Sequence, residues 1–137
     1  MFIDLLSDSG PDWTRAPPAS AQVLDELRIT FPSLPAVYYS LLAQTNGGEG
    51  ELAVEPGWFQ LWPAEAVAER NTGYEVAGAL PGCVAIGSNG GGELFALDPA
   101  GRVLVVPFIP MDLSEAVCIA DDVPGFARQF GHRLDAA

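Results

Sequence analysis

Few residues in this 137-residue chain have side chains suited to catalysis. The only histidine, His132, lies beside Arg133 near the C-terminus, and the two cysteines, Cys83 and Cys118, are far apart in the chain. This set is too small for a zinc site built from histidine and cysteine ligands. A Ser–His–acid triad would have to use His132, and the chain has no Gly-x-Ser-x-Gly nucleophile motif. We therefore expect no catalytic residue, no metal site and no cofactor.

The glycine-rich run at residues 87–92 is the segment most similar to a phosphate cradle. A cradle of that kind needs a following helix whose N–H groups point at the anion, and a P-loop also needs a lysine. Here a strand-like segment, 93–97, follows the run, its first residue is a glutamate that would repel phosphate, and the chain has no lysine. The pattern predicts that Gly90, Gly91 and Gly92 form a hairpin turn.

Two carboxylate pairs are candidates for acid–base chemistry: Glu49 with Glu51, and Asp121 with Asp122. Paired carboxylates can act in a hydrolase when their separation in space suits the reaction. The simpler interpretation is that Asp122 caps a helix and that Glu49 and Glu51 are solvated loop charges. A carboxylate-dependent hydrolase is kept as a remote alternative.

Two tryptophans, Trp58 and Trp62, follow this acidic segment. Strand alternation places both on one side and Phe59 and Leu61 on the other, so at least one indole is expected to be partly exposed. Exposed aromatic rings among acids suit a protein interface. The alternative is that both rings close the core against the preceding helix. The candidate partner-binding residues are Glu49, Glu51, Glu55 and Trp58.

The charge balance favours a protein partner. Eighteen acidic residues face six basic ones, all arginine, and the net charge is −12. Such a field repels nucleic acid and anionic membranes, and it accelerates association with a basic protein. The alternative is that the acidity only keeps the protein in solution. We expect a protein partner and no binding site for nucleic acid or membrane. The chain is expected to be a monomer or a weak dimer.

The N-terminal residues carry acids where a signal peptide needs basic ones, and no apolar run approaches the roughly 20 residues of a membrane span. The expected location is cytoplasmic. Because apolar residues flank Cys83 and Cys118, both thiols are expected to be free and buried.

The hydrophobic pattern predicts an α+β domain with an antiparallel sheet of four to six strands and roughly four helices. Residues 1–19 form a partly ordered extension, 20–134 the domain and 135–137 a tail. Ser20 and Ser33 are expected to cap the first two helices, and Asn46, Gly47 and Gly48 to end the second. The expected elements are helices at 20–31 and 34–45, strands at 51–54 and 58–62, a helix at 64–70, a loop at 71–82, strands at 83–86, 93–97, 102–109 and 116–120, and a closing helix from Asp122 to Leu134.

Three segments resemble the SUKH superfamily, whose Smi/Knr branch includes the fungal cell-wall-synthesis regulator. Residues 34–48 look like its Leu-Pro, helix, Asn-Gly-Gly opening, and residues 85–98 resemble its glycine-rich hairpin, with the next strand beginning at Gly101. Residues 119–130 are similar to its closing strand and helix with repeated phenylalanines. The resemblance covers roughly residues 20 to 131.

The resemblance implies an antiparallel sheet braced by helices and a function in protein binding. Bacterial members are mostly immunity proteins that neutralise toxins, often nucleases or nucleic-acid deaminases, and fungal relatives are regulatory scaffolds. The family has no catalytic residue to carry over to this chain. We expect a bacterial, non-enzymatic immunity protein that binds a cognate, basic toxin. A regulatory or scaffold domain with a non-toxin partner is the alternative.

Overall fold

Every strand of the sheet pairs with its neighbours in the sequence, so the whole sheet is one antiparallel meander in the order β1 to β7. The computed structural model describes residues 3–134. Its strands are β1 (Trp13–Arg15), β2 (Gly48–Glu51), β3 (Trp58–Leu61), β4 (Val84–Ser88), β5 (Glu93–Leu97), β6 (Val103–Pro107) and β7 (Val117–Ala120). Its helices are α1 (Ala21–Thr30), α2 (Ala36–Gln44), α3 (Ala64–Gly73), α4 (Val76–Ala79), the 3-10 helix η1 (Leu113–Glu115) and α5 (Val123–Ala127).

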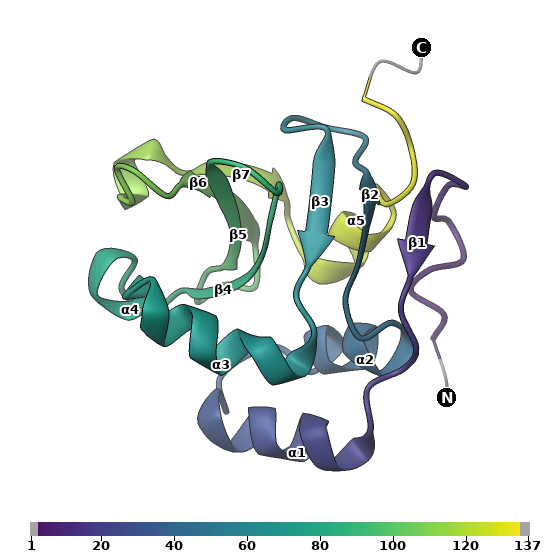
Figure 1. Cartoon of the computed structure of the whole chain (residues 1–137), viewed down its shortest axis with the longest axis horizontal. Helices are drawn as coiled ribbons and strands as arrows, with labels where there is room; N and C mark the ends of the chain where they lie inside the picture. Colours follow the sequence, from purple (N-terminus) through teal and green to yellow (C-terminus); the bar gives the residue numbers. More distant parts are fainter. Residues whose placement is uncertain (1–2, 135–137) are drawn as a thin grey trace.

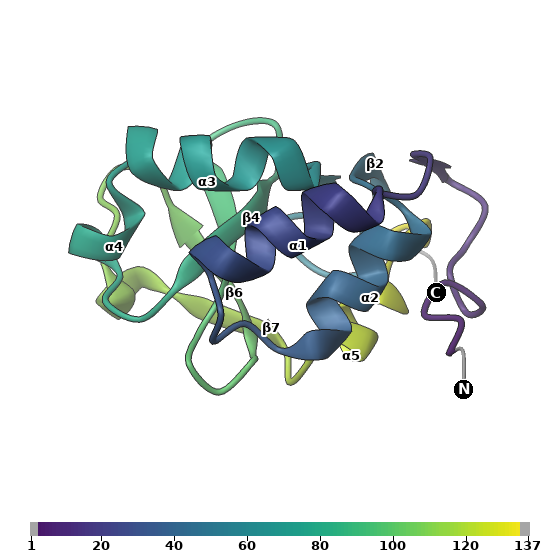
Figure 2. The ribbon, with the colours of Figure 1, turned by 90° about the horizontal axis from the view of Figure 1, so that it is seen from below.

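Four of the helices lie in two long excursions from the meander, whereas η1 lies between β6 and β7 and α5 follows β7. α1 and α2 lie between β1 and β2, and α3 and α4 lie between β3 and β4. Figure 1 shows a strongly curved sheet with α3 and α1 along its lower end and α5 behind β2 and β3. From below, α1 lies between α3 and α2, and it contacts both (Figure 2). None of the helices in residues 3–134 is long and apolar enough to cross a membrane.

Phenylalanines from α5 and the sheet form the centre of the core. Phe130, just after α5, stacks on Phe59 of β3 with ring centroids 4.0 Å apart, and it meets Phe126 edge to face at 4.9 Å. Phe126 in turn packs on Phe95 of β5 at 5.4 Å. Each buried aromatic ring removes about 150–250 Å² of surface from water. Because the row runs from β3 through α5 to β5, it joins the two halves of the curved sheet.

The predicted α+β class and antiparallel meander are confirmed, with seven strands rather than four to six. The added strand is β1, which lies before residue 20 and pairs with β2. Trp13 holds it there by packing on Phe59 and Phe130 at 5.9 and 5.4 Å. Leu5 and Leu6 are also buried. Phe2 and the predicted tail, 135–137, lie outside the described residues.

Several predicted boundaries are wrong. α2 begins after Pro35, whose φ of −64° and ψ of 142° place it at the N-cap, so Ser33 does not cap this helix. The predicted loop at 71–82 contains the end of α3 and all of α4. α5 ends at Ala127 because Phe130 turns back to pair with Leu52 in an isolated bridge. The predicted strand at 51–54 is instead Gly48–Glu51.

The predictions for the cysteines hold in part. Both thiols are free, Cys83 is buried, and Cys118 is exposed. Cys118 lies on β7, the last strand of the sheet. At this edge both faces are only partly covered, so an apolar sequence did not guarantee burial.

Candidate functional site

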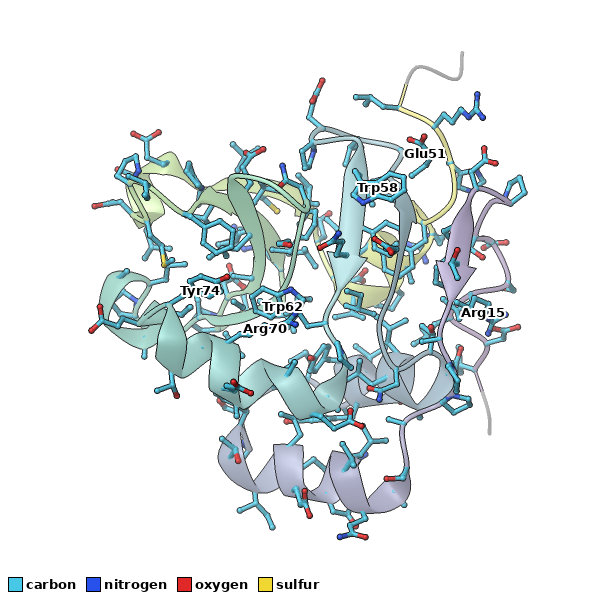
Figure 3. The ribbon with its side chains drawn as sticks, viewed as in Figure 1. Arg15, Glu51, Trp58, Trp62, Arg70 and Tyr74 are labelled. Carbon is cyan, nitrogen blue, oxygen red and sulfur yellow. The ribbon has the colours of Figure 1, made fainter. Side chains whose placement is uncertain are left out.

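The register of β2 and β3 brings three of the predicted partner-binding residues together. Glu51 lies directly opposite Trp58, and Glu49 lies opposite Gln60, whose Nε2 donates to Glu49 Oε2 at 3.2 Å. Paired residues on neighbouring strands point to the same face, so Glu49, Glu51 and Trp58 share one surface. Figure 3 shows Glu51 and Trp58 side by side on these strands. We call Glu49, Glu51 and Trp58 the acidic–aromatic patch.

The two tryptophans differ in exposure. Trp58 is 39% exposed, whereas Phe59 on the opposite face is fully buried. Trp62 lies one residue beyond β3, is 4% exposed and stacks on Tyr74. The structure therefore bears out the expectation of one exposed indole, and the alternative that both rings close the core is wrong for Trp58.

Glu55 does not belong to the acidic–aromatic patch. It lies in the turn between β2 and β3 and lines a groove of about 140 Å³ together with Glu93 and Val117. Val117 pairs with Val105 of β6, on the half of the sheet farther along the chain. The structure thus places this candidate beside a different surface from Glu51.

The acids of the patch are available to a partner. Three arginines are held in ion pairs with aspartates: Arg28 with Asp25, Arg102 with Asp98, and Arg133 with Asp12. Within residues 3–134, no cation lies within 4 Å of Glu49 or Glu51. Arg15 lines a shallow groove that also includes Glu49, but the two form no ion pair in the described chain. The carboxylates of the patch are thus not neutralised internally.

Asn46, Gly47 and Gly48 connect α2 to β2, and they also fix the start of α3. The φ values of Gly47 and Gly48 are 102° and 121°, which favour glycine. Asn46 Oδ1 accepts a hydrogen bond from the Ala64 N–H at 2.7 Å, and Asn46 Nδ2 donates to Glu65. The second bond lowers the pKa of Glu65. The sequence contains one sign of this capping role. α3 begins after Pro63, whose side chain cannot cap a helix, so the cap has to come from another segment.

Gly90, Gly91 and Gly92 lie in the turn between β4 and β5, which pair antiparallel. The N–H of Gly91 donates to Asn89 Oδ1, and the N–H of Gly90 donates to Ser88 Oγ. Because these two amides already have intramolecular partners, they do not form an anion nest.

The residues considered for catalysis do not converge. His132 is exposed, and its Nε2 lies 2.9 Å from the backbone oxygen of Asp8. Asp122 caps α5 through the Gly125 N–H, and burial raises the pKa of Cys83. No group of three or more His, Cys, Asp or Glu side chains within residues 3–134 is arranged to hold a metal ion.

A cavity of about 440 Å³ lies between the N-terminal segment and α2. Gln44 of α2 holds this segment in place. Its Oε1 accepts from the Leu5 N–H at 2.9 Å, and its Nε2 donates to the Ile3 oxygen at 2.6 Å. Asp4, Asp8 and Arg128 are at the cavity wall.

No protein-family model matches the chain, and no curated protein matches it.

Proposed function

We propose that this chain is a non-catalytic protein-binding domain of the SUKH type, an immunity protein that binds and neutralises a basic, nuclease-type bacterial toxin. The observation that carries the proposal is the pairing of exposed Trp58 with Glu51 on neighbouring strands, with Glu49 on the same face. Tryptophan is a frequent interface anchor, and carboxylates around it select a basic partner. The resemblance of residues 20–131 to the SUKH superfamily supports the same function.

Electrostatics explains why a nuclease is a suitable target. A nuclease needs a positive surface to hold the phosphates of its substrate. This protein has a net charge of −12 and presents carboxylates without ion pairs on the paired strands β2 and β3. It can therefore compete with the nucleic acid for that positive surface. Its association rate should fall as salt screens the two fields, with the Debye length shrinking from about 10 Å at 0.1 M to about 3 Å at 1 M.

The test uses the product of the adjacent gene as the candidate toxin. Co-expression with the wild-type chain should suppress the toxin's lethality, and the E49Q/E51Q variant should suppress it less. The matched control is E69Q/E115Q, which removes two exposed charges from α3 and η1. Equal binding of the toxin by both double variants would show that the patch is not part of the interface. An association rate that does not change with salt would contradict the electrostatic part of the proposal.

A regulatory or scaffold function gives a different result in the same experiment. The chain would then bind a non-toxin partner and leave the toxin's lethality unchanged. The loss of binding in E49Q/E51Q would still identify the surface that it uses.

A further inference from the structure

A cavity of about 330 Å³ lies between α3 and the sheet, and Gln60, which bonds Glu49 of the acidic–aromatic patch, is part of its wall. Its aromatic wall consists of Trp62, Tyr74 and Phe108, and Arg70 of α3 lies over the indole. Figure 3 shows Trp62, Arg70 and Tyr74 gathered together above α3. We call this cavity the Arg70 pocket.

The aromatic wall is continuous. The rings of Trp62 and Tyr74 are stacked with centroids 6.2 Å apart and an interplanar angle of 23°, and Phe108 meets Tyr74 at 4.7 Å. Tyr74 is 48% exposed, so one end of this wall is open to solvent. Trp62 is only 4% exposed, so the ring face that a flat group can reach belongs to Tyr74.

The charge of the Arg70 pocket is opposite to that of the rest of the protein. Arg70 makes no ion pair within residues 3–134, and no Asp or Glu of the described chain lines the pocket. The guanidinium lies 5.1 Å from the centre of the Trp62 ring, a cation–π distance that limits its freedom before any ligand arrives. Arg70 shares the lack of an ion pair within residues 3–134 with Arg15 and Arg128, but it is the one of the three that lies over the aromatic wall of this pocket.

The remaining polar groups narrow the class of ligand. The amides of Gly90 and Gly91, which also line the pocket, donate to Ser88 and Asn89 and are not free for an anion. Gln60 Nε2 donates to Glu49. Arg70 is thus the cationic donor of the pocket, and its planar guanidinium matches a carboxylate in a two-pronged hydrogen bond. Phosphate sites that use backbone nests need several free amides, which this pocket lacks.

We infer that the Arg70 pocket binds a carboxylate carried by a flat apolar group, such as a C-terminal aromatic residue of the protein partner. The inference rests on the proposed function in one respect only, namely that a protein partner carries the carboxylate. Gln60 connects the two sites, because it lines the pocket and bonds Glu49 of the patch. The partner then presents a basic surface to the patch and an acidic group to Arg70, which fixes its orientation.

The experiment titrates the isolated protein with small probes and follows the indole N–H of Trp62 and the Nε–H of Arg70 by NMR. The probes are N-acetylphenylalanine and benzoate, each compared with its neutral amide. Both carboxylates should bind more tightly than their amides. R70Q should weaken carboxylate binding at least about tenfold, and R70K should weaken it less, because lysine keeps the charge and loses the two-pronged geometry.

Controls separate this inference from the proposed function. R15Q and R128Q remove the other two arginines that lack an ion pair in the described residues, and they should bind the probes as wild type does. The probe assay contains no toxin, so its outcome does not depend on the proposed function. Tighter binding of N-acetylphenylalanine than of benzoate points to a chain end of a partner, and the reverse points to a free small carboxylate. Equal binding of acid and amide, or unchanged binding by R70Q, would overturn the inference.

Discussion

The side chain of Asn71 pairs with the backbone of Ala85 as a neighbouring strand would. Asn71 Oδ1 accepts from the Ala85 N–H at 2.8 Å, and Nδ2 donates to the Ala85 oxygen at 2.8 Å and to the Val67 oxygen. Ala85 lies where the register of β4 with β5 shifts. The amide therefore ties α3 to the sheet at an irregular point of the ladder, and it holds the helix that carries Arg70.

Asn71→Ala should destabilise the fold by about 2 to 4 kcal/mol, because it leaves two backbone groups of Ala85 without partners in a buried position. Urea unfolding monitored by circular dichroism measures the change. The matched control is Thr72→Ala, an exposed neighbour on α3, which should change stability by less than about 0.5 kcal/mol. Equal effects of the two substitutions would show that the Asn71 bridge contributes little.

Asp98→Asn should lower stability at neutral pH and have little effect in acid. Burial raises the pKa of Asp98, but hydrogen bonds from Arg102, the charge of Arg102 and a bond from Ala100 outweigh it, so the pKa is below its usual value. The carboxylate therefore stabilises the fold above its unfolded pKa of about 3.9, and this stabilisation is lost as the pH falls through the folded value.

Unfolding at several pH values tests this sign. At pH 7 the loss in Asp98→Asn should be about 1 to 3 kcal/mol, as for a hydrogen-bonded buried charge. Glu69→Gln, at an exposed position on α3, serves as the control and should follow wild type throughout. A loss that persists unchanged below the folded pKa would assign the role of Asp98 to its shape and not to its charge.

Two adjacent tyrosines should respond in opposite directions when their hydroxyls are removed. Tyr38 is fully buried, and its hydroxyl has no hydrogen-bond partner among the described residues, whereas the Tyr39 hydroxyl donates to the Phe31 oxygen. Tyr38→Phe should leave stability unchanged or raise it by about 1 kcal/mol, and Tyr39→Phe should lower it by about 1 kcal/mol. Burial also raises the pKa of Tyr38, so its phenol should ionise only when the chain unfolds, which ultraviolet absorbance detects.

The sequence predicts those parts of the fold that depend on local pattern. The meander from β4 to β6 follows from short, continuous apolar runs separated by turn residues, and the N-cap of α1 follows from Ser20. β1 is only three residues long, and its place depends on Trp13 meeting Phe59 and Phe130, which are distant in sequence. No local pattern in so short a segment could have identified it.

The same distinction applies to the candidate site. Strand alternation predicts that at least one of Trp58 and Trp62 is partly exposed, because this property depends on neighbouring residues. The sequence favours loop charges for Glu49 and Glu51, and their common face follows only from the pairing of β2 with β3. The Arg70 pocket depends on tertiary contacts, since it joins the end of β3, α3, the β4–β5 turn and Phe108. In the sequence Gln44 looks like an ordinary helix amide and Asn71 like the first residue of a loop, yet each bonds a separate segment of the chain.

Alanine substitutions of Trp58 and Trp62 should distinguish a residue that binds the partner from one that stabilises the fold. Trp58→Ala removes a ring that is 39% exposed, so the free energy of unfolding should change by less than about 1 kcal/mol. Trp62→Ala removes a ring that is 4% exposed and stacked on Tyr74, and it should cost about 3 kcal/mol or more. If Trp58 anchors the partner, its substitution should weaken binding by about 2 kcal/mol or more, roughly thirtyfold, mainly through faster dissociation. Surface plasmon resonance with the candidate toxin measures the association and dissociation rates. If Trp58→Ala instead lost much stability and bound the toxin as wild type does after correction for the folded fraction, this indole would be a structural residue. The interface would then lie outside the acidic–aromatic patch.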